Sequence, residues 1–121
     1  MKKIVCADDD PALQDVFSLI FGRAGYEVTM FTNGEQLLEK NYELPDVFLL
    51  DQQLSGINGM EICKYLKSQE DTRHIPVILV SASADLDKVS REAGADGFLE
   101  KPFKMSHLLG LLKKHLAEVA Y

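Results

Sequence analysis

Acidic side chains follow two of the short apolar runs of this 121-residue sequence, at the point where each run ends. Asp8, Asp9 and Asp10 come directly after residues 4–7, and Asp51 comes directly after residues 47–50. If the two runs are neighbouring parallel strands, these carboxylates converge, and their repulsion would raise some of their pKa values unless a cation neutralised them. Oxygen ligands suit a hard cation, so the pattern predicts a Mg²⁺ site. Asp10 is the exception, because its position before Pro11 is better explained as the N-cap of a helix.

Two further polar side chains follow the later apolar runs, Ser81 directly after residues 77–80 and Lys101 one residue beyond residues 98–99. Together with a metal, an ammonium and a hydroxyl would match the equatorial oxygens of a transferring phosphoryl group. An aspartate can be the nucleophile in that chemistry. Asp51 is our candidate because it stands alone before a long loop, whereas Asp8 and Asp9 are paired. The pattern predicts an acyl phosphate on Asp51, although Lys101 taken alone is equally well explained as a surface lysine before a turn-forming proline.

The elements that would position these residues alternate between two hydrophobic patterns. Short, mostly continuous apolar runs, typical of strands covered on both faces, occupy residues 4–7, 28–31, 47–50, 77–80 and 98–99. Helical patterns cover residues 11–24, 34–40, 59–68, 86–93 and the segment from 105 onward. Five strands alternating with five helices predict an α/β fold, a doubly wound parallel sheet with helices on both faces. In such sheets, functional groups gather beyond the carboxyl ends of the strands, where the strand order reverses.

The apolar stripes of the helices predict which side chains face the core. The first helix would turn inward Leu13, Val16, Phe17, Ile20, Phe21 and Ala24, and the last would turn inward Met105, Leu108, Leu109, Leu112, Leu116 and Val119. The stripe of residues 86–93 is the weakest, so we expect a mobile helix held by modest burial. Cys6 and Cys63 fall on inward positions, where thiols are commonly inert. The three histidines, His74, His107 and His115, fall on positions that we expect to be exposed.

Length and composition favour one globular domain over residues 1–121. The balance of 13 basic and 19 acidic residues gives a net charge of −6, the wrong sign for binding nucleic acid or anionic lipid by electrostatics alone. Two cysteines outside any CxxC motif do not make a disulfide framework or a structural zinc site. The sequence has no signal-peptide pattern and no apolar run that could span a bilayer. We therefore expect a cytoplasmic protein that contacts neither nucleic acid nor a membrane.

In the order and spacing of its motifs, the sequence resembles the receiver domain of two-component response regulators, the family that includes the single-domain chemotaxis regulators. The matching segments are Asp8-Asp9 after the first run, Phe48-Leu49-Leu50-Asp51 with Gly59 beyond it, Ser81-Ala82, and Lys101-Pro102-Phe103. The resemblance covers the whole chain. It implies a flavodoxin-like strand order of 2-1-3-4-5.

The resemblance also implies a role for each matching residue. Asp9, Asp51 and the backbone carbonyl of Gln53 would bind Mg²⁺ directly, and Asp8 would act partly through water. Lys101 would pair with the phosphoryl oxygens, and Ser81 would move to hydrogen-bond one of them. Phe98 would be the aromatic switch residue that turns inward on activation.

The sequence departs from the family pattern in the loops around this site. Ser55 stands where the family usually has proline, which predicts a less rigid loop in the unbound state. Ser81 replaces the commoner threonine and keeps its hydroxyl. Gln53 and Ser83 occupy the two variable positions that, in the family, tune the lifetime of the acyl phosphate.

We therefore expect a response regulator receiver that accepts a phosphoryl group on Asp51 from a sensor histidine kinase or a histidine phosphotransfer protein. Its conformation would then shift to control a downstream protein. It would catalyse only its own phosphorylation and autodephosphorylation, as a monomer or a weak phosphorylation-dependent dimer, and we expect it to have no output domain.

Three alternatives stay open beside this interpretation. The chain could be a receiver-fold interaction module that works without phosphorylation, or the excised receiver of a larger regulator. The third is a metal-dependent phosphatase with an aspartyl nucleophile. It is disfavoured because Gln53 stands where such enzymes usually carry an acid, two residues beyond the nucleophile.

Overall fold

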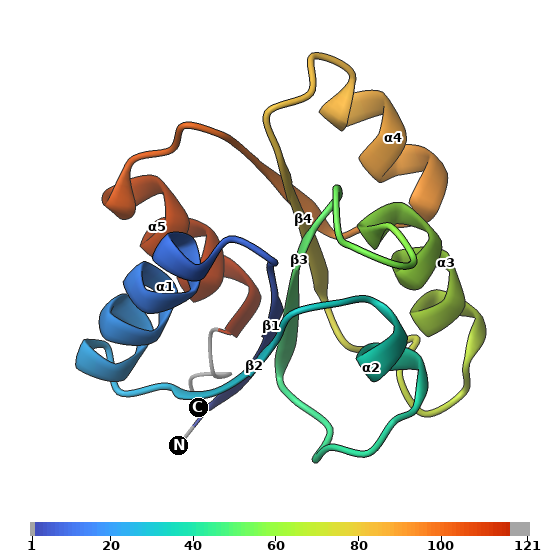
Figure 1. The fold of residues 1–121 in the computed structure, drawn as a ribbon, viewed down its shortest axis with the longest axis horizontal. Coiled ribbons are helices and arrows are strands. Elements are labelled where there is room, and N and C mark those ends of the chain that lie inside the picture. Colours follow the sequence, from blue (N-terminus) through green and yellow to red (C-terminus); the bar gives the residue numbers. More distant parts are fainter. Residues whose placement is uncertain (1, 117–121) are drawn as a thin grey trace, which may run out of the picture.

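Strands and helices alternate strictly along the computed structural model of the chain, which describes residues 2–116 (Figure 1). The strands are β1 (Lys3–Ala7), β2 (Glu27–Phe31), β3 (Val47–Asp51), β4 (Val77–Ser81) and β5 (Gly97–Glu100). The helices are α1 (Pro11–Arg23), α2 (Glu35–Leu38), α3 (Gly59–Ser68), α4 (Leu86–Ala93) and α5 (Met105–Leu116). The alternation predicted from the hydrophobic pattern is confirmed. None of the helices within residues 2–116 is long and apolar enough to cross a membrane.

The five strands form one parallel sheet in the order β2-β1-β3-β4-β5, which confirms the predicted strand order. Cys6 of β1 lies opposite Met30 of β2 on one side and Leu49 of β3 on the other. From β1 the chain first adds β2 at one edge of the sheet. It then crosses back past β1 and adds β3, β4 and β5 in turn on the other side, so the strand order reverses between β1 and β3. The carboxyl ends of β1 and β3 are therefore the edge where a site is expected in a fold of this kind.

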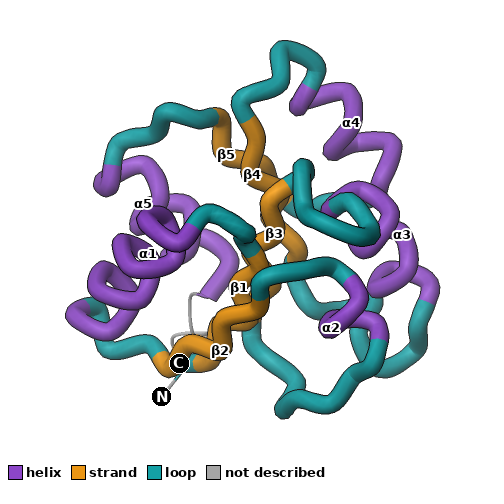
Figure 2. Tube along the Cα trace, viewed as in Figure 1, coloured by secondary structure: helices purple, strands orange, loops and turns teal. Residues whose placement is uncertain are grey.

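Helices cover both faces of this sheet and create two separate apolar cores (Figures 1 and 2). Helices α1 and α5 lie on one face, where Phe17, Phe21 and Leu108 pack on Ile4 and other strand residues. Helices α2, α3 and α4 lie on the other face. Every residue of β3 and β4 is buried, as predicted for continuous apolar strands between two helical layers.

Helix α2 is shorter than the segment 34–40 that the sequence predicts, and this is a correction. It covers only Glu35–Leu38, and its N-cap is Gly34 rather than Asn33. The Asn33 side chain still accepts a hydrogen bond from the backbone N–H of Gln36 at 3.1 Å. Lys40 has a φ of +53°, a left-handed conformation that a helix cannot continue through, so the helix ends before it.

Several predicted burial assignments also need correction. Val16 is 44% exposed because it lies at the margin of the apolar stripe of α1, whereas Ala24 and Met105 are exposed at the end of α1 and the start of α5. His115 is half-buried rather than exposed, and a side chain on Gly97 would meet its Nε2 atom at 3.2 Å. Phe98 is 41% exposed, so it is not a core residue in this state. The inward position predicted for Val119 lies outside the described residues.

The two cysteines are buried and unpaired, as the sequence predicts. Burial raises the pKa of the Cys63 thiol to about 11, and its Sγ donates to the backbone carbonyl of Ala93 at 3.4 Å. Burial also raises the pKa of the Cys6 thiol, and the nearby charge of Asp8 adds to that effect. Both groups are therefore neutral thiols at neutral pH, and neutral thiols are poor nucleophiles.

Candidate functional site

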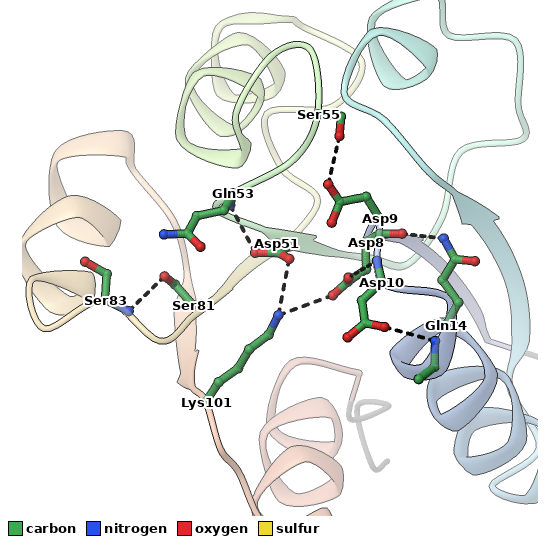
Figure 3. A network of polar contacts seen from close by, with 11 residues as sticks. Asp8, Asp9, Asp10, Gln14, Asp51, Gln53, Ser55, Ser81, Ser83 and Lys101 are labelled. Carbon is green, nitrogen blue, oxygen red and sulfur yellow. Dashed lines mark hydrogen bonds and ion pairs between the residues drawn. The ribbon is translucent and has the colours of Figure 1, made fainter.

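Three carboxylates meet where β1 and β3 end (Figure 3). Asp8 and Asp9 directly follow β1, and Asp51 is the last residue of β3. The parallel register places Ala7 opposite Leu50, which brings these two strand ends side by side. One carboxylate oxygen from each of the three residues lies within 4.8 Å of the others. Asp8 and Asp51 are buried, at 1% and 6% exposure, whereas Asp9 is exposed.

Lys101 brings an ammonium group to the same place from the end of β5 (Figure 3). Its Nζ atom donates to Asp51 Oδ2 at 3.2 Å and lies 3.5 Å from Asp8 Oδ2. The backbone N–H of Lys101 donates to the carbonyl of Ser81 at 2.8 Å, which fixes the start of this side chain against the end of β4. One cation is thus shared between two buried carboxylates.

Burial and the neighbouring charges shift the pKa values of two members of this cluster, Asp8 and Lys101. Burial raises the pKa of Asp8, and the neighbouring charge of Asp51 adds to the effect. The Asp10 backbone N–H, which donates to Asp8 Oδ1 at 2.9 Å, and the Lys101 ammonium only partly oppose it. Burial favours the neutral form of Lys101, but the charges of Asp51 and Asp8 outweigh it and raise the pKa of the amine. Lys101 is therefore charged at neutral pH.

The loop after β3 fixes the Asp51 carboxylate by close packing and by one backbone hydrogen bond. The N–H of Gln53 donates to Asp51 Oδ1 at 3.0 Å, and the N–H of Gly59 donates to the Gln52 carbonyl at 2.9 Å. A side chain on Gly59 would put its Cβ 2.3 Å from the Asp51 carbonyl oxygen. Only glycine fits there, which explains its position at the first turn of α3.

Ser81 ends β4 beside this cluster, whereas Phe98 lies two residues before the end of β5 and lines a separate pocket with Asp87 and Arg91. Ser81, the last residue of β4, is 1% exposed, and its Oγ accepts a hydrogen bond from the Ser83 N–H at 3.0 Å. Within residues 2–116, no hydrogen bond joins Ser81 to the three carboxylates (Figure 3). Phe98, in β5, is partly exposed on the sheet edge. The structure therefore places the carboxylates and Lys101 together and leaves the Ser81 hydroxyl turned toward its own loop.

Two polar contacts of the site were not predicted from the sequence. The Ser55 hydroxyl donates to Asp9 Oδ2 at 2.8 Å, and the Gln14 side chain donates to the Asp8 carbonyl. In the sequence, Ser55 stands out only because the family usually has proline at this position, and nothing in the sequence assigns Gln14 to the site. Asp10 does cap α1, as expected, because its Oδ1 accepts from the Ala12 N–H at 3.0 Å.

The donor set of this cluster fits a hard divalent cation. All three ligand groups are carboxylates, and a single lysine leaves them with an excess of negative charge. Burial is the main cause of the raised pKa of Asp8, and the charge of Asp51 adds to it. Carboxylate oxygens are the ligands of Mg²⁺ and Ca²⁺ rather than of soft metals. The cluster of Asp8, Asp9 and Asp51 can therefore hold such an ion.

An open cleft runs beside Lys101 and gives access to this edge of the sheet. Its volume is about 470 Å³, and its walls are mostly apolar. The residues that line it are Asp10, Leu13, Val16, Ala82, Lys101, Pro102 and Phe103. A partner side chain that enters this cleft would come close to the Lys101 ammonium.

Comparison with protein families identifies one model that covers nearly the whole chain. Residues 4–113 match the model described as the response regulator receiver domain. The DNA-binding response regulator MtrA of Mycolicibacterium smegmatis is 31% identical over an alignment 118 residues long, which covers 95% of this chain and 50% of MtrA. The chain thus spans about half the length of the curated relatives that it matches.

Two solved structures share this fold along almost their full length. A putative response regulator from Chloroflexus aurantiacus is 32% identical with a TM-score of 0.89, and the match covers 97% of this chain and 98% of that one. The receiver domain of the sensor histidine kinase PA1611 from Pseudomonas aeruginosa, crystallised with a magnesium ion in its active-site cleft, is 26% identical. Its TM-score is 0.87, and the match covers 97% of this chain and 98% of that domain.

Proposed function

The chain belongs to the response regulator receiver domain family, and on that premise we propose that its phosphoryl acceptor is Asp51. A phosphoryl acceptor role in two-component signalling is the function of this family. The assignment to Asp51 is supported by one observation above all. Asp51 and Asp8 are both buried, and each accepts a backbone N–H, but the Lys101 Nζ atom donates a hydrogen bond to Asp51 Oδ2 at 3.2 Å and lies farther from Asp8 Oδ2, at 3.5 Å.

Phosphoryl transfer would begin with attack of an Asp51 carboxylate oxygen on the phosphorus of a phosphohistidine. The phosphorus–nitrogen bond breaks, the histidine nitrogen leaves with the electron pair and takes up a proton, and an acyl phosphate remains on Asp51. Lys101, already 3.2 Å from Asp51 Oδ2, would neutralise charge on the phosphoryl oxygens. Ser81 would rotate its hydroxyl away from the Ser83 N–H to donate to another of those oxygens.

Mg²⁺ is the cofactor that we propose for this step, held by Asp8, Asp9, Asp51 and the backbone carbonyl of Gln53. When bound, it supplies charge neutralisation for the phosphoryl oxygens. The excess negative charge of the three carboxylates supports this assignment. The chain would catalyse nothing beyond its own phosphorylation and dephosphorylation.

The proposed partners follow from the family and from the cleft beside Lys101. A histidine kinase or a histidine phosphotransfer protein would donate the phosphoryl group, and a downstream protein would respond to the change in conformation. Residues 1–121 would form one receiver domain acting in the cytoplasm. Phe98 would serve as the switch residue, because its partial exposure leaves room to turn inward.

Intact mass measurement tests the acceptor assignment. The full chain is incubated with MgCl₂ and acetyl phosphate, with and without EDTA. We expect wild-type protein and Asp15→Asn, which neutralises an exposed carboxylate on α1, to gain the mass of one phosphoryl group only when magnesium is present. Asp51→Asn should gain none. Phosphorylation of Asp51→Asn at the wild-type level would contradict the assignment.

A further inference from the structure

The Ser55 hydroxyl makes a hydrogen bond that links the loop after β3 to the acidic cluster (Figure 3). Its Oγ donates to Asp9 Oδ2 at 2.8 Å, although the two residues are 46 positions apart in the sequence. Within residues 2–116, no second hydrogen-bond donor contacts the Asp9 carboxylate. Ser55 is thus the one contact that restricts how this exposed side chain turns.

Asp9 differs in this respect from the other two carboxylates. Asp8 is buried and accepts the Asp10 N–H, and Asp51 is buried and accepts the Gln53 N–H. Both also pair with Lys101. Packing and backbone donors therefore hold two of the three carboxylates, whereas the third depends on a serine.

The backbone around Ser55 is itself anchored, so its hydroxyl comes from a defined position. The N–H of Gly34 donates to the Ser55 carbonyl at 3.2 Å, and Asn33 and Ser55 form an isolated parallel β-bridge. Gly56 then turns the chain with a φ of +80°, a left-handed conformation that suits glycine. The loop after β3 is thereby fastened to the loop after β2, beside the site.

A hydroxyl in this position leaves the carboxylate free to bind a cation. An ionised carboxylate offers about four lone-pair positions on its two oxygens, and Ser55 occupies one of them. Hydrogen bonds to ligating carboxylates orient them, and their removal typically weakens metal binding by about 10–100-fold. Because Asp9 is exposed and water can replace part of the contact, we expect an effect at the lower end of that range.

We propose that Ser55 is a positioning residue of the cation site, whose hydroxyl holds the Asp9 carboxylate toward Asp8 and Asp51. The proposal rests on the function proposed above, because it assumes that these carboxylates bind Mg²⁺. It assigns a role in metal binding to a side chain that does not itself touch the metal. Its effect is therefore on cation affinity rather than on the reacting atoms.

A magnesium titration of the full chain, without any phosphoryl donor, tests this role. MgCl₂ is added to isotopically labelled protein, and the amide resonances of the site are followed by NMR. We expect Ser55→Ala to raise the dissociation constant about tenfold and Ser55→Thr, which keeps the hydroxyl, to restore it to within about twofold. Ser68→Ala, which removes a hydroxyl that donates to the Tyr65 carbonyl at the end of α3, should leave the constant unchanged.

A double variant separates positioning of Asp9 from a general effect on the loop. If Ser55 acts through Asp9, the double variant Ser55→Ala/Asp9→Ala binds magnesium no more weakly than Asp9→Ala alone. Wild-type affinity in Ser55→Ala, or independent losses in the double variant, would overturn the proposal. So would a loss of affinity accompanied by a shifted Gly34 amide resonance, because the loop anchor would then be the cause.

The outcome also distinguishes this proposal from the function on which it rests. Wild-type protein that binds no magnesium would overturn both the cofactor assignment and the role of Ser55. Normal magnesium binding with the predicted loss in Ser55→Ala, but no phosphoryl group on Asp51 in the mass experiment, would support Ser55 and contradict the acceptor assignment.

Discussion

Asp8 offers the sharpest test of the electrostatics of the site, because its charge is expected to destabilise the metal-free fold. It is 1% exposed, and its pKa is raised by burial and by the charge of Asp51. Asparagine has nearly the same shape and can still accept the hydrogen bond from the Asp10 N–H. Asp8→Asn therefore removes the charge and little else, and we expect it to increase the free energy of unfolding.

The size of this gain can be worked out from the distances in the cluster. At an effective dielectric constant of about 20, two carboxylate oxygens no more than 4.8 Å apart repel by at least about 3 to 4 kcal/mol. Asp8 has two such neighbours, Asp9 and Asp51, but it also has an ammonium at 3.5 Å, which attracts it by about 5 kcal/mol. Repulsion exceeds attraction by about 2 kcal/mol, and water around Asp9 and Lys101 screens part of it. We expect Asp8→Asn to stabilise the protein by about 1 kcal/mol.

Urea unfolding at pH 7 in EDTA measures this difference. Asp15→Asn is the matched control, because it makes the same change in net charge on an exposed face of α1. Asp15→Asn should change the unfolding free energy by less than about 0.5 kcal/mol. An Asp8→Asn variant that is less stable than wild type in EDTA would refute the reasoning. With saturating MgCl₂ the order should reverse, because only wild type keeps all three carboxylates for the ion.

The same comparison has a defined pH dependence. The pKa of Asp8 is raised in the folded state above its ordinary value of 3.8, so folding favours the protonated form. The stability of wild type is then highest, relative to the variant, below pH 3.8, and falls as pH rises through the raised pKa. The advantage of Asp8→Asn should therefore vanish well below pH 3.8 and grow as the pH rises through the raised pKa of Asp8. An advantage that grows as the pH is lowered would contradict this sign.

Two further predictions concern packing. Gly59→Ala should lower the unfolding free energy by about 2 kcal/mol and reduce phosphorylation in the mass assay, because its Cβ would meet the Asp51 backbone at 2.3 Å. Gly110→Ala, with no atom within 4 Å of the new Cβ, should instead stabilise α5 by about 0.5 to 1 kcal/mol, and equal effects of the two would contradict this account. Phe17→Ala should cost about 3 to 5 kcal/mol in urea unfolding, because Phe17 is 1% exposed and stacks between two other phenylalanines. Leu19→Ala, at a position 56% exposed on the same helix, should cost less than about 0.5 kcal/mol, and a comparable loss there would contradict this account.

Much of the fold could be predicted from the sequence because its three central strands, β1, β3 and β4, are buried on both faces. Continuous runs such as 47–50 and 77–80 have no solvent-facing positions, so their hydrophobicity alone identifies them. The failures lie where a residue depends on its neighbours in space. Helix α2 ends early because Lys40 adopts a left-handed conformation, and His115 is half-buried because Gly97 leaves room for it. Neither effect has a signal in the local sequence.

In the candidate site, the residues at the ends of strands could be predicted from the sequence, whereas the contacts between loops could not. The meeting of Asp8, Asp9, Asp51 and Lys101 follows from a general property of parallel sheets, since the carboxyl ends of the strands share one edge. The hydrogen bond from Ser55 to Asp9 follows from no such rule. It depends on how one loop crosses another, and only three-dimensional coordinates reveal that.

The confinement of the chemistry to strand ends has a practical consequence for protein engineering. Asp8, Asp51 and Lys101, the proposed reacting groups, lie at the ends of strands and not on α1, α4 or α5 (Figure 3). Surface residues on those helices can be exchanged in libraries without touching the atoms that we propose to handle phosphate. The domain could thus be retargeted to new signalling circuits while its reactivity stays constant.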